Sequence, residues 1–357
     1  MNPAIVDPIA VTEQASRNGR PKAGVVEALA NQEYDRDVLM QALQLQYEEQ
    51  QELWALARAR RRGCFPNDEV EVRSVIEVSN VCRQACHYCG MAKGNPQPKY
   101  LMPHDEFVEV VDHLYSWGRR VLLVQSGENQ SQKFVDYAAR CTKSITDKYP
   151  GLEVILCLGN LSDAQYRQLK AAGAARYILK FETANAELYH KLKPTDTLEE
   201  RVACLENLIE LGYKVGTGNI VGLPGQTLED LVDDLLFCGR WQMSMVSSTV
   251  FIAGEDTHLR GAPTGNLDWT LNTLALMRIM YPERLIPTTS PLERLRPGGQ
   301  AMGLLAGANT ITIHDGTPEQ MKKLFTIYAT KRFTPNAENL YNSAKTAGLG
   351  LAKGSLI

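Results

Sequence analysis

The sequence lacks the features that mark membrane, secreted and nucleic-acid-binding proteins. No apolar run in its 357 residues approaches the length needed to cross a bilayer. The N-terminal segment carries Asp7 and Glu13, where a signal peptide needs an unbroken apolar stretch. Lysine and arginine total 38 against 41 aspartate and glutamate, so no basic excess points to a nucleic-acid partner. We therefore expect a cytoplasmic protein that binds neither membranes nor nucleic acids.

A disulfide framework is not expected either, because a cytoplasmic compartment keeps thiols reduced. Five of the eight cysteines are scattered along the chain, as is usual for small apolar residues. The other three, Cys82, Cys86 and Cys89, lie close together in the stretch SNVCRQACHYCG. Their clustering requires a chemical explanation.

From residue 67 to residue 330 the sequence alternates short apolar runs with longer amphipathic segments. The apolar runs predict strands over 74–79, 120–126, 153–159, 176–182, 214–223, 245–252, 284–289 and 308–313. The amphipathic segments predict helices over 103–117, 131–148, 162–172, 197–211, 227–240, 268–281 and 298–306. Eight such alternations over about 240 residues favour an α/β fold of the (βα)₈ TIM-barrel type. An open, doubly wound sheet remains the alternative.

The barrel region is flanked by two further segments. Residues 1–66 predict an N-terminal arm and helices, with a short helix near 25–30 and a long one over 34–63. Residues 331–357 predict a C-terminal helix and a tail. The expected organisation is therefore 1–66, the barrel over 67–330, and 331–357.

The three clustered cysteines follow the first predicted strand, at the end of a barrel where such enzymes carry their active sites. A structural zinc site normally needs four ligands. No second cysteine pair is present, and His87 is badly spaced to complete a tetrahedron. Three thiolates suit a 4Fe–4S cluster with one iron left open for a small molecule. Zinc binding, or three incidental cysteines, is the alternative.

The spacing C-x3-C-x2-C, with Tyr88 directly before the last cysteine, resembles the cluster loop of the radical S-adenosylmethionine (SAM) superfamily. The resemblance implies two cofactors, a 4Fe–4S cluster and SAM, with SAM bound at the open iron. It implies that an electron from the cluster cleaves SAM to methionine and a 5′-deoxyadenosyl radical, which abstracts hydrogen from the substrate. The implied partners are a small-molecule substrate and a reducing electron donor such as flavodoxin or ferredoxin.

Further motifs match the SAM-binding residues of this superfamily. QSGEN (125–129) resembles the turn whose backbone and glutamate meet the amino group of SAM. Glu182 and Arg201 match a pair that grips SAM, and an arginine fork is well suited to a carboxylate. Gly222 lies in a turn that can let the backbone approach the adenosine moiety. The candidate cofactor-binding residues are Tyr88, Ser126, Gly127, Glu128, Glu182, Arg201 and Gly222.

From about residue 70 to 330 the sequence is similar to a group that contains HydE-type hydrogenase maturases, methylornithine synthases (PylB type) and biotin synthases. The stretches FETAN and GLPGQT look nearest to the HydE type. Thr289 and Ser290 match two threonines that face substrate carboxylates in that type. Lys180 and Phe181 stand where it has an arginine and a histidine, which implies a different substrate side because lysine lacks the bidentate fork.

Biotin synthases need a second cluster, held by further cysteines inside the barrel. The corresponding positions here include Ile155 and Gly216, and Cys157 is two residues displaced from one of them. We therefore expect one catalytic cluster and a HydE-like reaction on a small carboxylate-bearing or amino-acid-like substrate. One alternative is a PylB-like mutase or lyase that rearranges an amino-acid carbon skeleton. Another is a non-catalytic iron–sulfur electron-transfer protein, which would usually use four cysteines.

Overall fold

The computed structural model of the protein describes residues 24–328 and 337–357. The predicted arm before residue 24 lies outside the described residues, as does the start of the predicted C-terminal segment. None of the helices in the described ranges combines the length and apolar character that crossing a membrane requires.

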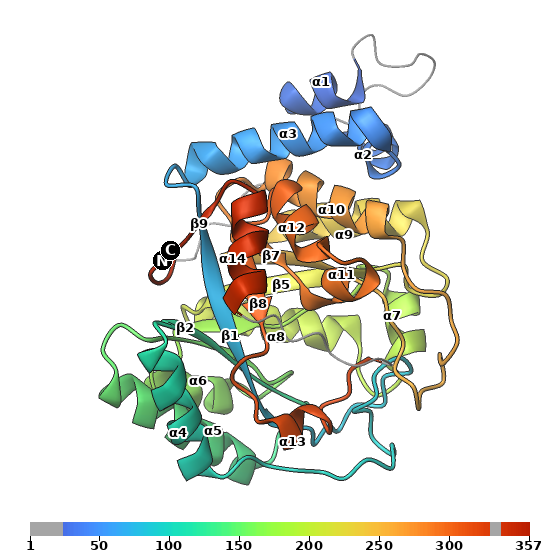
Figure 1. Ribbon diagram of the computed structural model, residues 1–357. Helices are drawn as coiled ribbons and strands as arrows, with labels where there is room; N and C mark the ends of the chain where they lie inside the picture. The colour runs from blue at the N-terminus through green and yellow to red at the C-terminus, as the bar shows by residue number, and fades with distance from the viewer. Residues whose placement is uncertain (1–23, 329–336) are drawn as a thin grey trace.

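Within the described residues, eight parallel strands form the sheet at the centre of the molecule (Figure 1). Neighbouring strands follow the order β6-β5-β4-β3-β2-β1-β8-β7, and a parallel bridge between Met245 and Leu285 connects the two ends of this path. The sheet is thus a nearly closed barrel, which confirms the predicted fold over the open-sheet alternative. The strands are β1 (Glu69–Ser79), β2 (Val121–Ser126), β3 (Glu153–Cys157), β4 (Arg176–Ile178), β5 (Lys214–Val221), β6 (Met245–Val250), β7 (Pro287–Thr288) and β8 (Thr310–Ile313).

Helices connect the strands and cover the outside of the barrel. Two of them begin with reciprocal caps, in which Ser162 pairs with Gln165 and Thr227 with Asp230. Seven helices agree with predicted segments, apart from small shifts at their ends and a final 3₁₀ turn, η1 (Cys238–Arg240). They are α4 (His104–Ser116), α5 (Gln132–Lys148), α6 (Asp163–Ala171), α8 (Leu198–Glu210), α9 (Leu228–Phe237), α10 (Leu267–Met280) and α12 (Gly299–Leu305).

Three short helices were not predicted, because four to seven residues are too few for a helical period to stand out. They are α7 (Ala186–Leu192), α11 (Ser290–Leu295) and α13 (Glu319–Lys322), in the segments that follow β4, β7 and β8. After α14 (Ala337–Thr346), a final strand β9 (Gly350–Leu351) pairs with the start of β1.

The N-terminal helices α1 (Val25–Ala30), α2 (Arg36–Leu43) and α3 (Tyr47–Cys64) form an outer layer over the barrel helices, where α3 packs on α10 (Figure 1). The single long helix predicted over 34–63 is wrong, because the chain breaks between α2 and α3. The side-chain amide of Asn272 donates to the carbonyl oxygens of Leu43 (3.1 Å) and Leu45 (2.9 Å). This contact from α10 satisfies carbonyls that a break in the helix releases.

The half of the barrel interior nearer the amino ends of the strands is filled by an apolar layer and an ionic layer. Inward-facing residues of five strands, among them Val75, Leu123 and Ile155, form an apolar cluster. Below it, the carboxylate of Glu71 bridges Arg73 (2.7 Å) and Arg176 (2.9 Å). Space for a ligand is therefore left at the carboxyl ends of the strands.

Candidate active site

A cavity of about 220 Å³ lies at the carboxyl ends of the barrel strands. Its walls come from the loop after β1, the ends of β2 to β6, α8, and the segment at 327–328. Ten of the fourteen predicted site residues line it: Cys82, Cys86, Tyr88, Cys89, Ser126, Gly127, Glu128, Lys180, Glu182 and Arg201. The structure thus brings together residues that are more than a hundred positions apart in the sequence.

The cysteine loop that follows β1 is held in place by backbone hydrogen bonds to several other segments. Arg83 N–H donates to the carbonyl of Glu128 (2.8 Å), and His87 N–H donates to the carbonyl of Leu192 (2.9 Å). A Cβ at Gly127 would lie 2.5 Å from the carbonyl oxygen of Val81. Only glycine therefore lets the turn after β2 come this close to the cysteine loop.

The three thiols line the cavity and are half-buried by the surrounding protein. Burial raises the pKa of Cys82, of Cys89 and, to about 12, of Cys86. Thiolates at these positions therefore need positive charge, which bound iron would supply. No three histidine, cysteine, aspartate or glutamate side chains within 24–328 and 337–357 are placed to hold one metal ion. In a 4Fe–4S cluster each cysteine can bind a separate iron.

A buried ionic network supports the cavity beside the cysteine loop. Arg201 on α8 donates to Asp196 (2.6 Å) and to the hydroxyl of Tyr189 (3.0 Å), and lies 3.4 Å from Glu128. Lys193 lies 3.1 Å from the same aspartate. Burial opposes ionisation of Asp196, but Arg201 and Lys193 outweigh it and lower the pKa of this carboxyl well below its usual range. The network fixes the Arg201 guanidinium in one orientation.

Glu182, which follows β4, has a strained backbone. Its φ of 66° lies in the left-handed region, which a residue with a side chain seldom adopts. The conformation is held by hydrogen bonds from its N–H to Gly218 (3.0 Å) and from Ile220 N–H to its carbonyl (2.8 Å). Lys180, which is predicted to face the substrate, lies with its ammonium 3.2 Å from the Glu182 carboxylate. The structure therefore pairs the two side chains that the resemblance assigns to different ligands.

The remaining four predicted site residues do not line the cavity. Phe181 is fully buried outside the barrel, with its ring centroid 4.6 Å from that of Phe237. Gly222 packs against another loop, because a Cβ there would lie 2.3 Å from the Cα of Gly265. Thr289 and Ser290 lie one layer behind the wall. The hydroxyl oxygen of Thr289 is 3.3 Å from that of Thr249, and the hydroxyl oxygen of Ser290 is 3.3 Å from Nε2 of His314.

Several cavity residues were not predicted. Strand alternation could have identified Cys157, Thr249 and Phe251, since each faces inward two positions after another inward residue. Tyr328 has no comparable signal, because it comes from a segment without regular structure. Other unpredicted residues that line the cavity are Gln84, Met91, Gln125, Gly159, Ile178, Leu179, Lys193, Ile220, Val250, Ile252 and Ile327.

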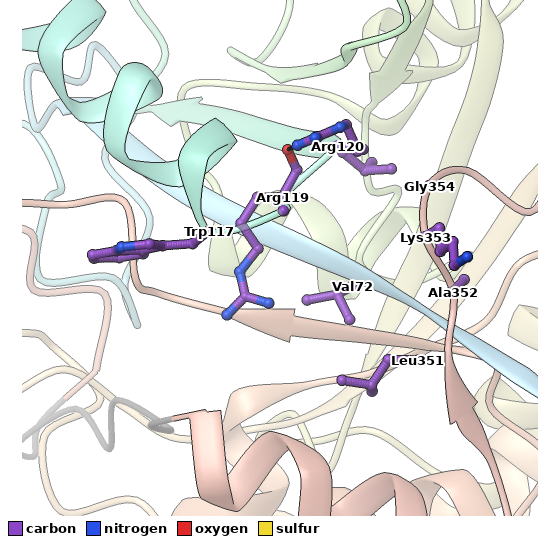
Figure 2. Close-up of a pocket in the computed structure, with 10 residues that line it drawn as sticks. Val72, Trp117, Arg119, Arg120, Leu351, Ala352, Lys353 and Gly354 are labelled. Carbon is purple, nitrogen blue, oxygen red and sulfur yellow. Dashed lines mark hydrogen bonds between the residues drawn. The ribbon is translucent and has the colours of Figure 1, made fainter.

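A second cavity, of about 230 Å³, lies at the side of the barrel between β1 and the C-terminal segment. Figure 2 shows Trp117, Arg119 and Arg120 on one side of it and residues 351–354 on the other. Arg119 already pairs with Asp315 (3.0 Å), and the Arg120 guanidinium lies over the ring of Tyr115. None of the predicted site residues lines this cavity.

Proteins of known family match this chain in sequence. The model of the Radical SAM superfamily matches residues 76–238. The [FeFe] hydrogenase maturase subunit HydE of Thermotoga maritima is 40% identical over 309 residues, which are 86% of this chain and 87% of that protein. Biotin synthase 2 of Frankia casuarinae is 28% identical over 75% of this chain and 74% of its own length. These matches confirm the predicted resemblance.

Solved structures match the fold. Methylornithine synthase (PylB) has a TM-score of 0.79 at 23% identity, covering 92% of this chain and 97% of its own. HydG, a maturase of the [FeFe]-hydrogenase, has a TM-score of 0.77 at 18% identity, covering 92% of this chain and 76% of its own. At these identities the likeness concerns the barrel itself.

Proposed function

Because this chain belongs to the radical SAM superfamily, we propose that it is a HydE-type enzyme that acts on a small carboxylate-bearing substrate in the cavity. It is a radical SAM enzyme, and its cofactors are a 4Fe–4S cluster and SAM. When bound, the two cofactors supply a one-electron reductant and a source of an organic radical.

Cys82, Cys86 and Cys89 would hold the cluster. Two observations support this fit: the thiols line one cavity, and Gly127 packs the neighbouring turn against their loop. A cluster held by three cysteines retains one iron without a protein ligand, which is where SAM would bind.

The buried charges beside the cysteine loop would orient SAM. Arg201, fixed by Asp196, would hold the carboxylate, since a guanidinium suits a carboxylate. Glu128 and Glu182 would accept hydrogen bonds from the ammonium group. Tyr88, whose ring lies edge-on to that of Phe251, would cover the bound molecule and exclude water. Ser126 and Gly127 would contribute backbone groups, and a role for Gly222 remains a prediction that its packing against Gly265 does not support.

The HydE-type assignment depends on one observation, the 40% identity to HydE over more than four-fifths of both chains. We propose that the reaction belongs to the maturation of a metal cofactor of the kind named for HydE, with an electron donor such as flavodoxin or ferredoxin. A PylB-like rearrangement of an amino acid is the second candidate; methylornithine synthase shares the barrel fold, and the fold by itself does not choose between the two reactions.

The cluster assignment is tested by Cys86→Ala in anaerobically reconstituted protein. We expect loss of both bound iron and reductive cleavage of SAM to 5′-deoxyadenosine, with the circular dichroism of the barrel unchanged. Cys64→Ala is the matched control, because Cys64 is an exposed cysteine at the end of α3. Retention of SAM cleavage in Cys86→Ala would refute the assignment.

A further inference from the structure

Arg294 on α11 carries a buried guanidinium group that has no hydrogen-bond partner among the described residues. Its three nitrogen atoms, Nε, Nη1 and Nη2, are all shielded from solvent, and within the part of the chain that the structure describes none of them makes a hydrogen bond. Other buried arginines are paired. Arg176 has two carboxylate partners and Arg278 donates to three backbone carbonyls. A buried charge without a partner is costly, so an anion that supplied one would bind favourably.

The position of Arg294 connects this charge to the active-site cavity. Its guanidinium lies over the ring of Tyr328, 5.4 Å from the centroid, and Tyr328 lines the cavity together with Thr249. Ser290 lies one helical turn earlier on the same face of α11. The hydroxyl of Ser290 contacts His314, an inward-facing residue after β8. Arg294 therefore lies behind Tyr328, next to the cavity but outside the residues that line it.

Within the described residues, Arg294 lies next to the cavity, behind Tyr328, and has no acidic partner. The cations that line the cavity each have one. Lys180 pairs with Glu182 (3.2 Å), Lys193 with Asp196 (3.1 Å), and Arg201 with Asp196 (2.6 Å). Lys180, which the sequence favours for the substrate, is thus already neutralised.

The geometry points to Arg294 as the residue that binds an anionic group of the substrate, a carboxylate, held bidentately beside the Ser290 hydroxyl. This inference rests on the proposed function, because it takes the cavity as the substrate site. A planar carboxylate matches the guanidinium fork, and its negative charge would balance the buried cation. Arg294 thereby selects substrates that carry a carboxylate far enough from the reacting carbon to reach past Tyr328.

The test measures anion binding to the reconstituted holoenzyme with SAM present. Acetate, succinate, glutarate and inorganic phosphate are titrated by calorimetry and by the rise in melting temperature that a ligand of the native state causes. We expect at least one carboxylate to bind, and its Kd to increase about tenfold or more in Arg294→Met. Arg294→Lys should recover part of the affinity, because it keeps the charge but not the fork. Arg296→Met, at an exposed arginine two residues further on, should bind like the wild type.

A second readout separates ligand binding from a structural role. Without added anion, Arg294→Met should melt no lower than the wild type, because the change removes an unpaired buried charge and keeps an aliphatic chain beside Tyr328. If Arg294 only stabilised the fold, the Arg294→Met protein would have a lower melting temperature than the wild type.

Three results would overturn the inference: no binding of any carboxylate by the wild type, equal binding by wild type and Arg294→Met, or tighter Arg294-dependent binding of phosphate than of every carboxylate. Formation of 5′-deoxyadenosine is measured separately on the same samples. Its absence in the wild type would defeat the proposed function, while the titrations would still report on Arg294.

Discussion

The ionic layer that closes the barrel floor provides a quantitative test of the structure. Glu71 is fully buried and holds two buried guanidinium groups, those of Arg73 at 2.7 Å and Arg176 at 2.9 Å. It also accepts a hydrogen bond from the backbone N–H of Leu356 (2.9 Å). In Glu71→Gln the charge that compensates Arg73 is lost, while Arg176 retains Glu153. Removing one member of a buried ion pair typically costs about 3–5 kcal/mol.

This cost can be converted to a melting temperature. An unfolding entropy of about 2.1 cal/mol/K per residue gives about 0.75 kcal/mol per degree for a chain of this length. Glu71→Gln should therefore lower the melting temperature by about 4–7 °C. The double change Glu71→Leu with Arg73→Met should recover most of this loss, because an apolar pair replaces the ionic one without leaving a buried charge.

The assay is calorimetry of the anaerobic holoenzyme, with SAM cleavage measured in parallel. Glu153→Gln is the matched control, because its loss leaves Arg176 paired with Glu71 and should cost less. A Glu71→Gln protein that melts within one degree of the wild type would refute the reasoning. So would a double variant less stable than Glu71→Gln.

Three further predictions concern the acid limb of stability, the cysteine loop and the outer core. Although burial would raise it, Arg73 and Arg176 lower the pKa of Glu71 to about 2 from 4.5. The contribution of ionised Glu71 to the free energy of unfolding is therefore complete above pH 4.5 and declines as the pH falls toward 2. Between these pH values the melting temperature of the wild type should fall more steeply with decreasing pH than that of Glu71→Gln. Equal slopes would contradict this. Gly127→Ala should lower the iron content after reconstitution, because the added Cβ would collide with the backbone of Val81. Gly63→Ala should leave the iron content unchanged, because no atom lies within 4 Å of a Cβ there. Normal iron content in Gly127→Ala would contradict this prediction. Phe181→His should destabilise the protein by about 1–3 kcal/mol with SAM cleavage retained, because the side chain is buried outside the barrel against Phe237. A gain in turnover at unchanged stability would show that this side chain faces the substrate instead.

Local patterns in the sequence determined the architecture and the kind of chemistry. Alternating apolar runs and amphipathic segments predict the barrel, because strand and helix periods are local properties of the chain. The spacing of Cys82, Cys86 and Cys89 indicates the cluster for a similar reason, since its ligands lie within one loop.

Tertiary structure alone decided the features that depend on distant contacts. Asn272 satisfies carbonyls at the break between α2 and α3, so no helical period could reveal that break. Asp196 joins Lys193 to Arg201, and Tyr328 reaches the cavity from the segment that follows the last barrel strand, because folding brings these segments to one place. The orientation of Phe181 depends on its packing against Phe237, and the missing hydrogen-bond partner of Arg294 depends on which groups surround it. These neighbours come from distant parts of the chain, so the sequence does not identify them.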